Sequence, residues 1–260
     1  MLTLVAFNYA LILVIVAILI LIKKTIRTEA AERALFIVAP IVTIVLHYST
    51  LIYLCMTGAD AYAYLRSNPN LILPIYPCNA VMWCALIYGL MRNKDGRFSL
   101  FLSDYVFWFG IASTLVGLFA NVDFITNPDL RNYEVVKSIL AHATLLFNLL
   151  LIPVLGRLKP SFFRNMFSIA ASSAGMYLIG LYCNLVYEVV GSAEMAYNVN
   201  SMFIIHSPFE SLQFLRYPII AAVSLVIYFV IFTVCDLINT PRGERWFDRI
   251  RKRVATRVKK

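Results

Sequence analysis

The chain has 260 residues, of which 61% are hydrophobic and 14% are charged, and its formal net charge is +9. Soluble domains are about half apolar and about a quarter charged, so this composition excludes an ordinary soluble globule and predicts an all-α, polytopic membrane protein. The positive charge does not indicate a nucleic-acid partner, because the basic residues flank apolar segments, as in membrane anchors.

Seven apolar segments follow one another, each close to the roughly 20 residues that cross a bilayer as a helix. Lys23 and Lys24 follow the first segment and no basic residue precedes it, so we interpret it as a span and not as a cleaved signal peptide. We therefore predict one seven-helix transmembrane domain over residues 1–240. Its spans are expected at residues 2–22, 34–56, 71–91, 99–121, 135–156, 163–190 and 213–238.

The basic residues predict the orientation. Nineteen of the 23 lysines and arginines fall in the first, third and fifth connections or in the C-terminal tail. The positive-inside rule places these segments in the cytoplasm, so the N-terminus is expected outside and the C-terminus inside. We expect an integral protein of a bacterial plasma membrane. The remaining four basic residues, on the outer side, are Arg66, Arg131, Lys137 and Arg216.

The tail, residues 241–260, is predicted to be cytoplasmic. Trp246, Ile250, Val254 and Val258 recur every four residues, with arginine and lysine between them. This spacing fits a short interfacial helix whose partner is the anionic inner leaflet. A disordered basic tail explains the charge equally well.

Three polar or reactive side chains on different spans are predicted to lie at one depth. Each is 14 or 15 residues from the basic residue at the inner end of its span, about 21–23 Å along a helix. Such residues are rare in spans unless they pair or act, so their shared level predicts a polar pocket that opens to the outer face. The pairs that define the level are His47 with Arg33, Cys78 with Arg92, and His142 with Arg157.

The surroundings of Cys78 favour a helix that begins inside the membrane. Proline is preferred in the first turn of a helix, so the third span is expected to begin near Pro77. The unpaired N–H groups of that turn would activate a thiol at Cys78, and those of Cys78 and Asn79 could hold an oxyanion. A cysteine there, with His142 at the same depth, has the components for thioester chemistry.

Four short elements between about Arg33 and Asp236 resemble the YwaF-like integral membrane family, to which transmembrane protein 164 belongs. The resemblance implies seven helices and, for the transmembrane protein 164 branch, a cysteine-dependent acyltransferase that moves fatty acyl groups between phospholipids. It implies that Cys78 is the nucleophile and His142 the general base. The elements are Leu73-Pro74 to Cys78, Ser138 to His142, Asn184, and Asn200 to Phe203 followed by Pro208.

Our leading hypothesis is therefore a membrane-embedded acyltransferase or acyl hydrolase that acts on phospholipids and lysophospholipids through a thioacyl intermediate, without a cofactor. His47, Asn79, Asn184 and Asn200 are candidate pocket or orienting residues. A second hypothesis is a small transporter or lipid-binding partner subunit without a covalent step. A metal held by the cysteine and the two histidines is a further alternative, but no carboxylate at this depth completes a usual ligand set.

Asp104 and Asp236 lie toward the inner ends of their predicted spans. We interpret both as interfacial anchors, although a proton or ion path could also use them.

Overall fold

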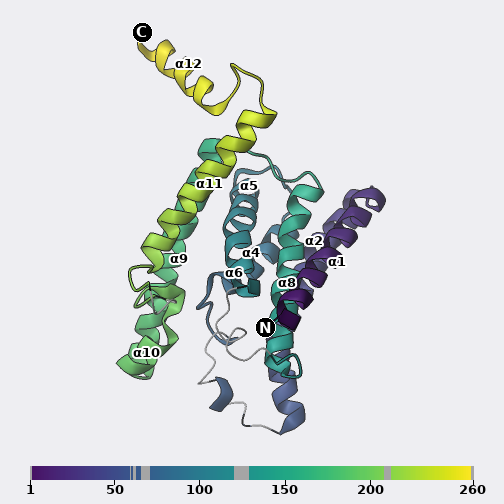
Figure 1. Ribbon diagram of the computed structural model, residues 1–260, viewed down its shortest axis with the longest axis vertical. Helices are drawn as coiled ribbons and strands as arrows, with labels where there is room; N and C mark the ends of the chain where they lie inside the picture. Colours follow the sequence, from purple (N-terminus) through teal and green to yellow (C-terminus); the bar gives the residue numbers. More distant parts are fainter. Residues whose placement is uncertain are drawn as a thin grey trace.

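The computed structural model describes residues 2–58, 60, 63–65, 71–119, 129–207 and 212–258. Within these ranges the secondary structure is helical throughout, and six helices are long and apolar enough to cross a membrane (Figure 1). The protein is therefore a polytopic integral membrane protein, as its composition predicts. In chain order its elements are α1 (Leu2–Thr25), α2 (Glu29–Thr57), α4 (Pro77–Leu90), α5 (Arg97–Asp104), η2 (Tyr105–Phe109), α6 (Gly110–Phe119), α8 (Tyr133–Val154), α9 (Phe162–Val190), α10 (Ala193–Val199), η3 (Ser201–Phe203), α11 (Tyr217–Asn239) and α12 (Trp246–Val258).

The third predicted span, residues 71–91, is helical only over α4. Its 14 residues rise about 21 Å, which is less than the roughly 30 Å of the hydrocarbon core. The helix begins at Pro77, as the sequence predicts, and residues 71–76 approach it in irregular backbone. Tyr76 is extended (φ −117°, ψ 152°), the conformation that a following proline favours.

The fourth predicted span is one helical run from Arg97 to Phe119 whose middle, η2, is a π-helix. A Cβ atom at Gly110, directly after η2, would lie 2.9 Å from the side chains of both Val81 and Leu149. Glycine therefore lets the run approach α4 and α8 closely at this point. The apolar pattern of the sequence does not reveal the π-helix, a feature that often marks functional sites.

Asp104 ends α5 just before the π-helix and is fully buried. Its carboxylate accepts hydrogen bonds from Arg164 Nε at 2.7 Å and Ser168 Oγ at 3.4 Å. The interpretation of Asp104 as an interfacial anchor is therefore wrong, because its charge is paired inside the protein.

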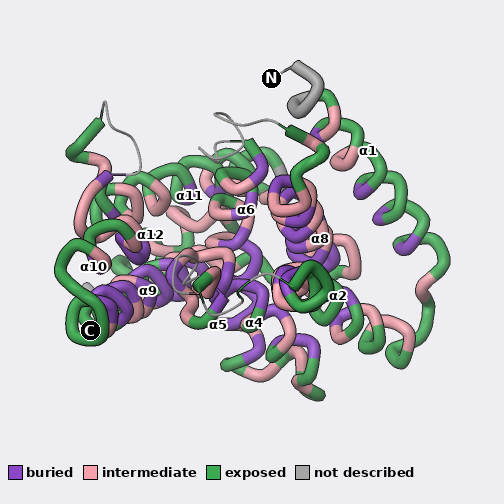
Figure 2. The backbone as a smooth tube through the Cα atoms, turned by 90° about the horizontal axis from the view of Figure 1, so that it is seen from below, coloured by how far each residue is buried: buried purple, intermediate pink, exposed green. Residues whose placement is uncertain are grey.

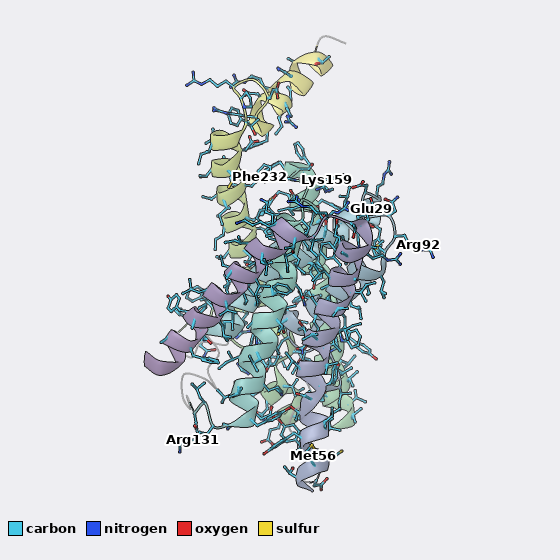
Figure 3. The ribbon with its side chains drawn as sticks, turned by 90° about the vertical axis from the view of Figure 1, so that its right-hand side faces the viewer. Glu29, Met56, Arg92, Arg131, Lys159 and Phe232 are labelled. Carbon is cyan, nitrogen blue, oxygen red and sulfur yellow. The ribbon has the colours of Figure 1, made fainter. Side chains whose placement is uncertain are left out.

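The two ends of the bundle differ in charge. Figure 3 shows Glu29, Arg92 and Lys159 at one end, and Met56 and Arg131 at the other. Lys159 pairs there with Asp95, in the connection between α4 and α5, at 2.6 Å. The positive-inside rule predicts that this end faces the cytoplasm. Arg66, one of the four basic residues expected on the outer side, lies outside the described residues.

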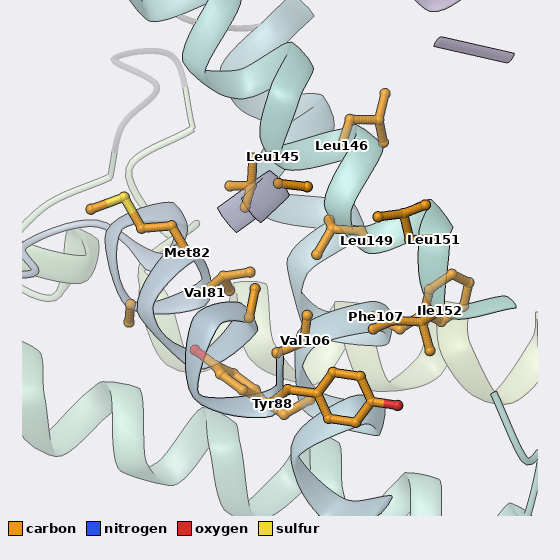
Figure 4. Close-up of a cluster of buried hydrophobic side chains, with 14 of the residues drawn as sticks. Val81, Met82, Tyr88, Val106, Phe107, Leu145, Leu146, Leu149, Leu151 and Ile152 are labelled. Carbon is orange, nitrogen blue, oxygen red and sulfur yellow. The ribbon is translucent and has the colours of Figure 1, made fainter. Parts of the chain in front are cut away.

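The core lies where α4, the η2–α6 run and α8 meet (Figures 2 and 4). α1 and α11 leave most of their apolar side chains exposed, as suits contact with lipid. Asn8 nevertheless ties α1 to the bundle, because its Nδ2 donates to the main-chain oxygen of Leu118 at 2.6 Å. This asparagine is 2% exposed, and the apolar pattern of the first span gives no hint of its contact.

Residues Trp246–Val258 of the C-terminal tail form a helix, α12. Asp236 holds its start, since the carboxylate accepts from Trp246 N–H at 3.0 Å and from Thr240 Oγ1 at 2.9 Å. The Trp246 ring stacks on Phe162, with ring centres 4.3 Å apart. The start of α12 is thus packed on the inner ends of α9 and α11.

Lys94 closes the inner end of α4 and predicts a pH dependence of stability. Its Nζ donates to the main-chain oxygens of Tyr88 and Gly89 and lies 4.1 Å from the centre of the Tyr88 ring. Burial lowers the pKa of this amine from 10.5 to about 8. Between these values the unfolded state binds more protons, so this group makes stability rise with pH across that window.

We expect the Tm of the wild-type protein to rise relative to that of Lys94→Met as the pH increases from about 8 to about 10. Thermal unfolding of both proteins in the same detergent buffers measures the difference. Parallel pH profiles for the two proteins would contradict the prediction.

Candidate functional site

The first turn of α4 presents the thiol of Cys78. The side chain of Asn79 closes this turn, because its Oδ1 accepts from the N–H of Tyr76 at 3.2 Å. The Cys78 thiol is half-buried and lies against the N–H groups of Cys78 and Asn79, at the positive end of the helix dipole. The N–H of Asn79 also donates to Tyr76 O at 3.1 Å, so an oxyanion would share this donor with a main-chain carbonyl. Of the two groups, the N–H of Cys78 is the better candidate for binding an oxyanion.

His47 joins this turn from α2. Its Nε2 lies 3.2 Å from Nδ2 of Asn79, which is 4% exposed. An amide nitrogen only donates, so Nε2 of His47 accepts and the ring proton of the neutral imidazole sits on Nδ1. The structure therefore brings together two residues that the sequence places at one depth, directly beside Cys78.

His142 lies on α8 with its ring against α6. Its Nδ1 is 2.8 Å from the main-chain oxygen of Ser138, which only accepts, so Nδ1 carries the proton of the neutral ring. This leaves Nε2 as an acceptor, the state that a general base needs. The edge of the ring, with Nε2 and Cδ2, packs on Gly117 of α6. Among the described residues, no hydrogen bond joins His142 to Cys78.

Buried apolar side chains, shown in Figure 4, follow Cys78 and His142 along α4 and α8 toward the basic end of the bundle. Val81, one turn inward from Cys78, is 0% exposed, and Leu145, one turn inward from His142, is 3% exposed. Leu149 completes this apolar layer and is also 0% exposed. This core separates the polar level from the basic end of the bundle.

The segment after α10 fixes the backbone that leads into α4. The main-chain oxygen of Ile75 accepts from Met202 N–H at 2.8 Å and from Ser201 Oγ at 3.1 Å. Asn184 on α9 holds Ser201 from the other side, accepting from its N–H at 2.8 Å and donating to its oxygen at 3.3 Å. Asn184 therefore acts through Ser201 on the approach to Cys78, and among the described residues no hydrogen bond joins it to His142.

Asn200 shapes the same segment. It adopts a left-handed conformation (φ 43°), and its side chain bonds the main chain of Ile205 and His206. Met202 and Phe203 also have positive φ, at 55° each. Such conformations cost roughly 1–3 kcal/mol each and persist only where the surroundings impose them. Three in four residues make this the most strained described segment, and Pro208, which follows it, lies outside the described residues.

Lys137 forms a buried polar cluster that sequence analysis missed. It is 8% exposed, and its Nζ donates to Thr50 Oγ1 and to Glu134 Oε2, each at 2.6 Å. The cluster lies on α8 about 7.5 Å outward from His142 along the helix axis. The Glu-x-x-Lys spacing at the start of the predicted span is the sequence signal for this cluster. Charges in an apolar helix are costly unless they are paired, so two opposite charges three residues apart indicate a paired, buried cluster.

The structure gives no support to the metal alternative. Within the described ranges no three His, Cys, Asp or Glu side chains lie close enough to hold an ion. All five cysteines are free thiols, among them Cys55 and Cys183.

Gly117 predicts how tightly the His142 ring is held. A Cβ atom at this position would lie 2.2 Å from both Nε2 and Cδ2 of His142, so Gly117→Ala must displace the ring and weaken its bond to Ser138 O. We expect any activity that depends on His142 to fall about 10- to 100-fold, with a stability loss of about 1–3 kcal/mol.

Turnover and thermal unfolding of the purified variant check this prediction. Gly175→Ala on α9 is the matched control, because a Cβ atom there would meet no other atom within 4 Å. Equal turnover in Gly117→Ala and Gly175→Ala would show that the position of the ring does not matter.

Comparison with known proteins identifies a family. The sequence model of the TMEM164 family matches residues 1–235, which is most of the chain. The match covers α1 to the inner end of α11, and with them every candidate residue of the polar level. The wider YwaF-like grouping stays an expectation from sequence. No curated protein and no solved structure matches the chain.

Proposed function

The chain belongs to the TMEM164 family, and from this premise we propose that it is a membrane-embedded, cysteine-dependent acyltransferase or acyl hydrolase of phospholipids. The observation that carries the proposal is the start of α4. There a half-buried thiol lies against main-chain N–H groups inside the membrane, beside a histidine–asparagine pair. A thiol in the first turn of a helix is well placed to act as a nucleophile.

The proposed reaction has two half-reactions. His142 Nε2 accepts the proton of Cys78, and the thiolate adds to the carbonyl carbon of an acyl ester. The N–H of Cys78 stabilises the oxyanion. Collapse breaks the ester C–O bond, His142 returns the proton to the leaving oxygen, and a lysophospholipid departs. A hydroxyl of a second lysolipid, or water, then attacks the thioester and gives its proton to His142. The C–S bond breaks, and His142 passes the proton to the Cys78 thiolate, which regenerates the thiol.

The tautomer of His142 supports its role as the base, because Nδ1 donates to Ser138 O and Nε2 is left as acceptor. His47 and Asn79 are proposed to position the first turn of α4, since Asn79 bonds both Tyr76 and His47. Asn184 and Asn200 are proposed to hold the backbone before it through Ser201. No hydrogen bond joins the thiol and His142 in the described structure, so the reaction requires the two groups to come within hydrogen-bond reach when substrate binds.

The test is acyl transfer in lipid nanodiscs that contain a phospholipid with a deuterated acyl chain and an unlabelled lysophospholipid. The proposal predicts labelled chains on the acceptor with wild-type protein and none with Cys78→Ala. Transfer by Cys78→Ala at the wild-type rate would overturn it, and free labelled fatty acid without transfer would identify a hydrolase.

A second candidate is a lipid-binding protein or small transporter without a covalent step. The lack of a hydrogen bond between Cys78 and His142 in the described structure favours it. In that case Cys78→Ser would leave lipid binding or transport almost unchanged, because serine keeps the size and polarity of the side chain.

We also propose that the polar level opens to the outer face of a bacterial plasma membrane and that α12 lies on the anionic inner leaflet. Lysine and arginine gather at the inner end of the bundle and along α12, which supports this orientation. A tag placed after Lys260 should be protected in intact cells. A tag that reacts from outside would reverse the orientation.

A further inference from the structure

A small cavity lies between α2, α4, η2 and α8, next to the apolar layer. Its volume is about 10 Å³, and its lining includes Phe36, Pro40, Tyr88 and Asn148. A cavity that holds one water needs about 10–15 Å³ by this measure and two to four polar partners. The size is thus that of a single water molecule, and its polar lining decides whether one is present.

Two buried polar atoms on this lining lack a hydrogen-bond partner. They are Asn148 Oδ1 and the Tyr88 hydroxyl, on residues that are 3% and 1% exposed. The amide of Asn148 is fixed, because its Nδ2 donates to Thr43 Oγ1 at 2.9 Å, so Oδ1 is the free acceptor. A buried polar group without a partner costs about 1–3 kcal/mol, so two of them on the lining of one cavity require an explanation.

Neither side chain can easily turn away from the cavity. The Tyr88 ring lies between Phe36, in an edge contact with centres 5.4 Å apart, and Lys94, whose Nζ is 4.1 Å from the ring centre. The backbone adds a third polar group. Pro40 has no N–H, so the Phe36 carbonyl, one turn earlier in α2, lacks its usual helical donor.

From these contacts we propose that the cavity is a binding site for one ordered water molecule. The water accepts the hydrogen of the Tyr88 hydroxyl and donates its own two hydrogens to Asn148 Oδ1 and the Phe36 carbonyl. These are three hydrogen bonds, the usual number for a buried water. The site ties the inner end of α4 to α2 and α8, and so helps to hold the helix whose other end carries Cys78. It stands independently of the acyl-transfer proposal.

A double-mutant cycle tests whether one molecule links the two side chains. Tyr88→Phe and Asn148→Leu should each lower the Tm by roughly 3–6 °C, because each leaves the remaining polar groups of the cavity without a full set of hydrogen bonds. The double variant should melt within about 2 °C of Asn148→Leu alone, since neither side-chain polar group then remains. Additive shifts would overturn the proposal.

Tyr228→Phe is the matched control, because its hydroxyl is also buried without a partner but Tyr228 does not line the cavity. Its effect should be the same in the wild-type and Asn148→Leu backgrounds. A structure at a resolution that shows ordered water separates a bridging water from a direct contact. Density about 2.7–3.1 Å from both Asn148 Oδ1 and Tyr88 Oη supports the proposal, whereas an empty cavity or a direct bond between them overturns it.

Discussion

Cys78→Ser should reduce acyl transfer at least about 1,000-fold while the protein still folds. Serine keeps the size of the side chain and its place in the first turn of α4, but its hydroxyl is a far weaker nucleophile than a thiolate at neutral pH. Rates of transfer in nanodiscs, together with thermal unfolding, measure the two effects separately. We expect the Tm of the variant to stay close to that of the wild type, because the half-buried thiol makes no hydrogen bond to a side chain in the described structure.

Cys84→Ser is the control for this substitution. Cys84 lies on the same helix and is also half-buried, but six residues further on it points about 120° away from Cys78 around the helix axis. It should keep transfer close to the wild-type rate. Loss of transfer in both variants, or in neither, would refute a specific role for Cys78.

Gly89→Ala should destabilise the protein by about 3–5 kcal/mol, the largest structural effect that we expect. A Cβ atom there would lie 1.9 Å from the main-chain oxygen of Phe36 and 2.6 Å from its carbonyl carbon. These are backbone atoms of α2, so no side-chain rotation relieves the overlap, and α2 and α4 must move apart. That movement would also disturb Tyr88 and the Lys94 contacts at the end of α4.

Yield of folded protein and Tm in detergent measure this effect. Gly175→Ala should be neutral or slightly stabilising, because the space around it is open and alanine favours a helix. A Gly89→Ala protein that melts within about 2 °C of the control would contradict the close approach of α2 and α4.

The features that follow from local chemistry could be predicted from the sequence. Pro77 predicts the start of α4, since proline suits the first turn and disfavours helix before it. Counting residues from the basic flanks predicts the shared depth of His47 and Cys78, and Asn79, the residue after Cys78, contacts His47. A rise per residue, however, gives depth and not rotation, so it could not show that the ring of His142 packs on Gly117.

Other features depend on contacts between distant parts of the chain. Ser201 and Ile75 are 126 residues apart in the sequence, so no local pattern predicts the hydrogen bond between them. The burial of Lys137 depends on Thr50 of another helix, so the residue was assigned to the outer side on its charge alone. The π-helix over Tyr105–Phe109 needs the packing of α4 and α8 around it, which hydrophobic periodicity does not describe.

Intact mass spectrometry of the purified protein, after incubation with a diacyl phospholipid, tests the central claim most directly. The account predicts an added acyl mass on the wild-type protein, its removal by hydroxylamine, and its absence from Cys78→Ala. Wild-type protein that gains no acyl mass and releases no lysolipid, across several headgroups, would contradict the thioester mechanism and favour the binding or transport function.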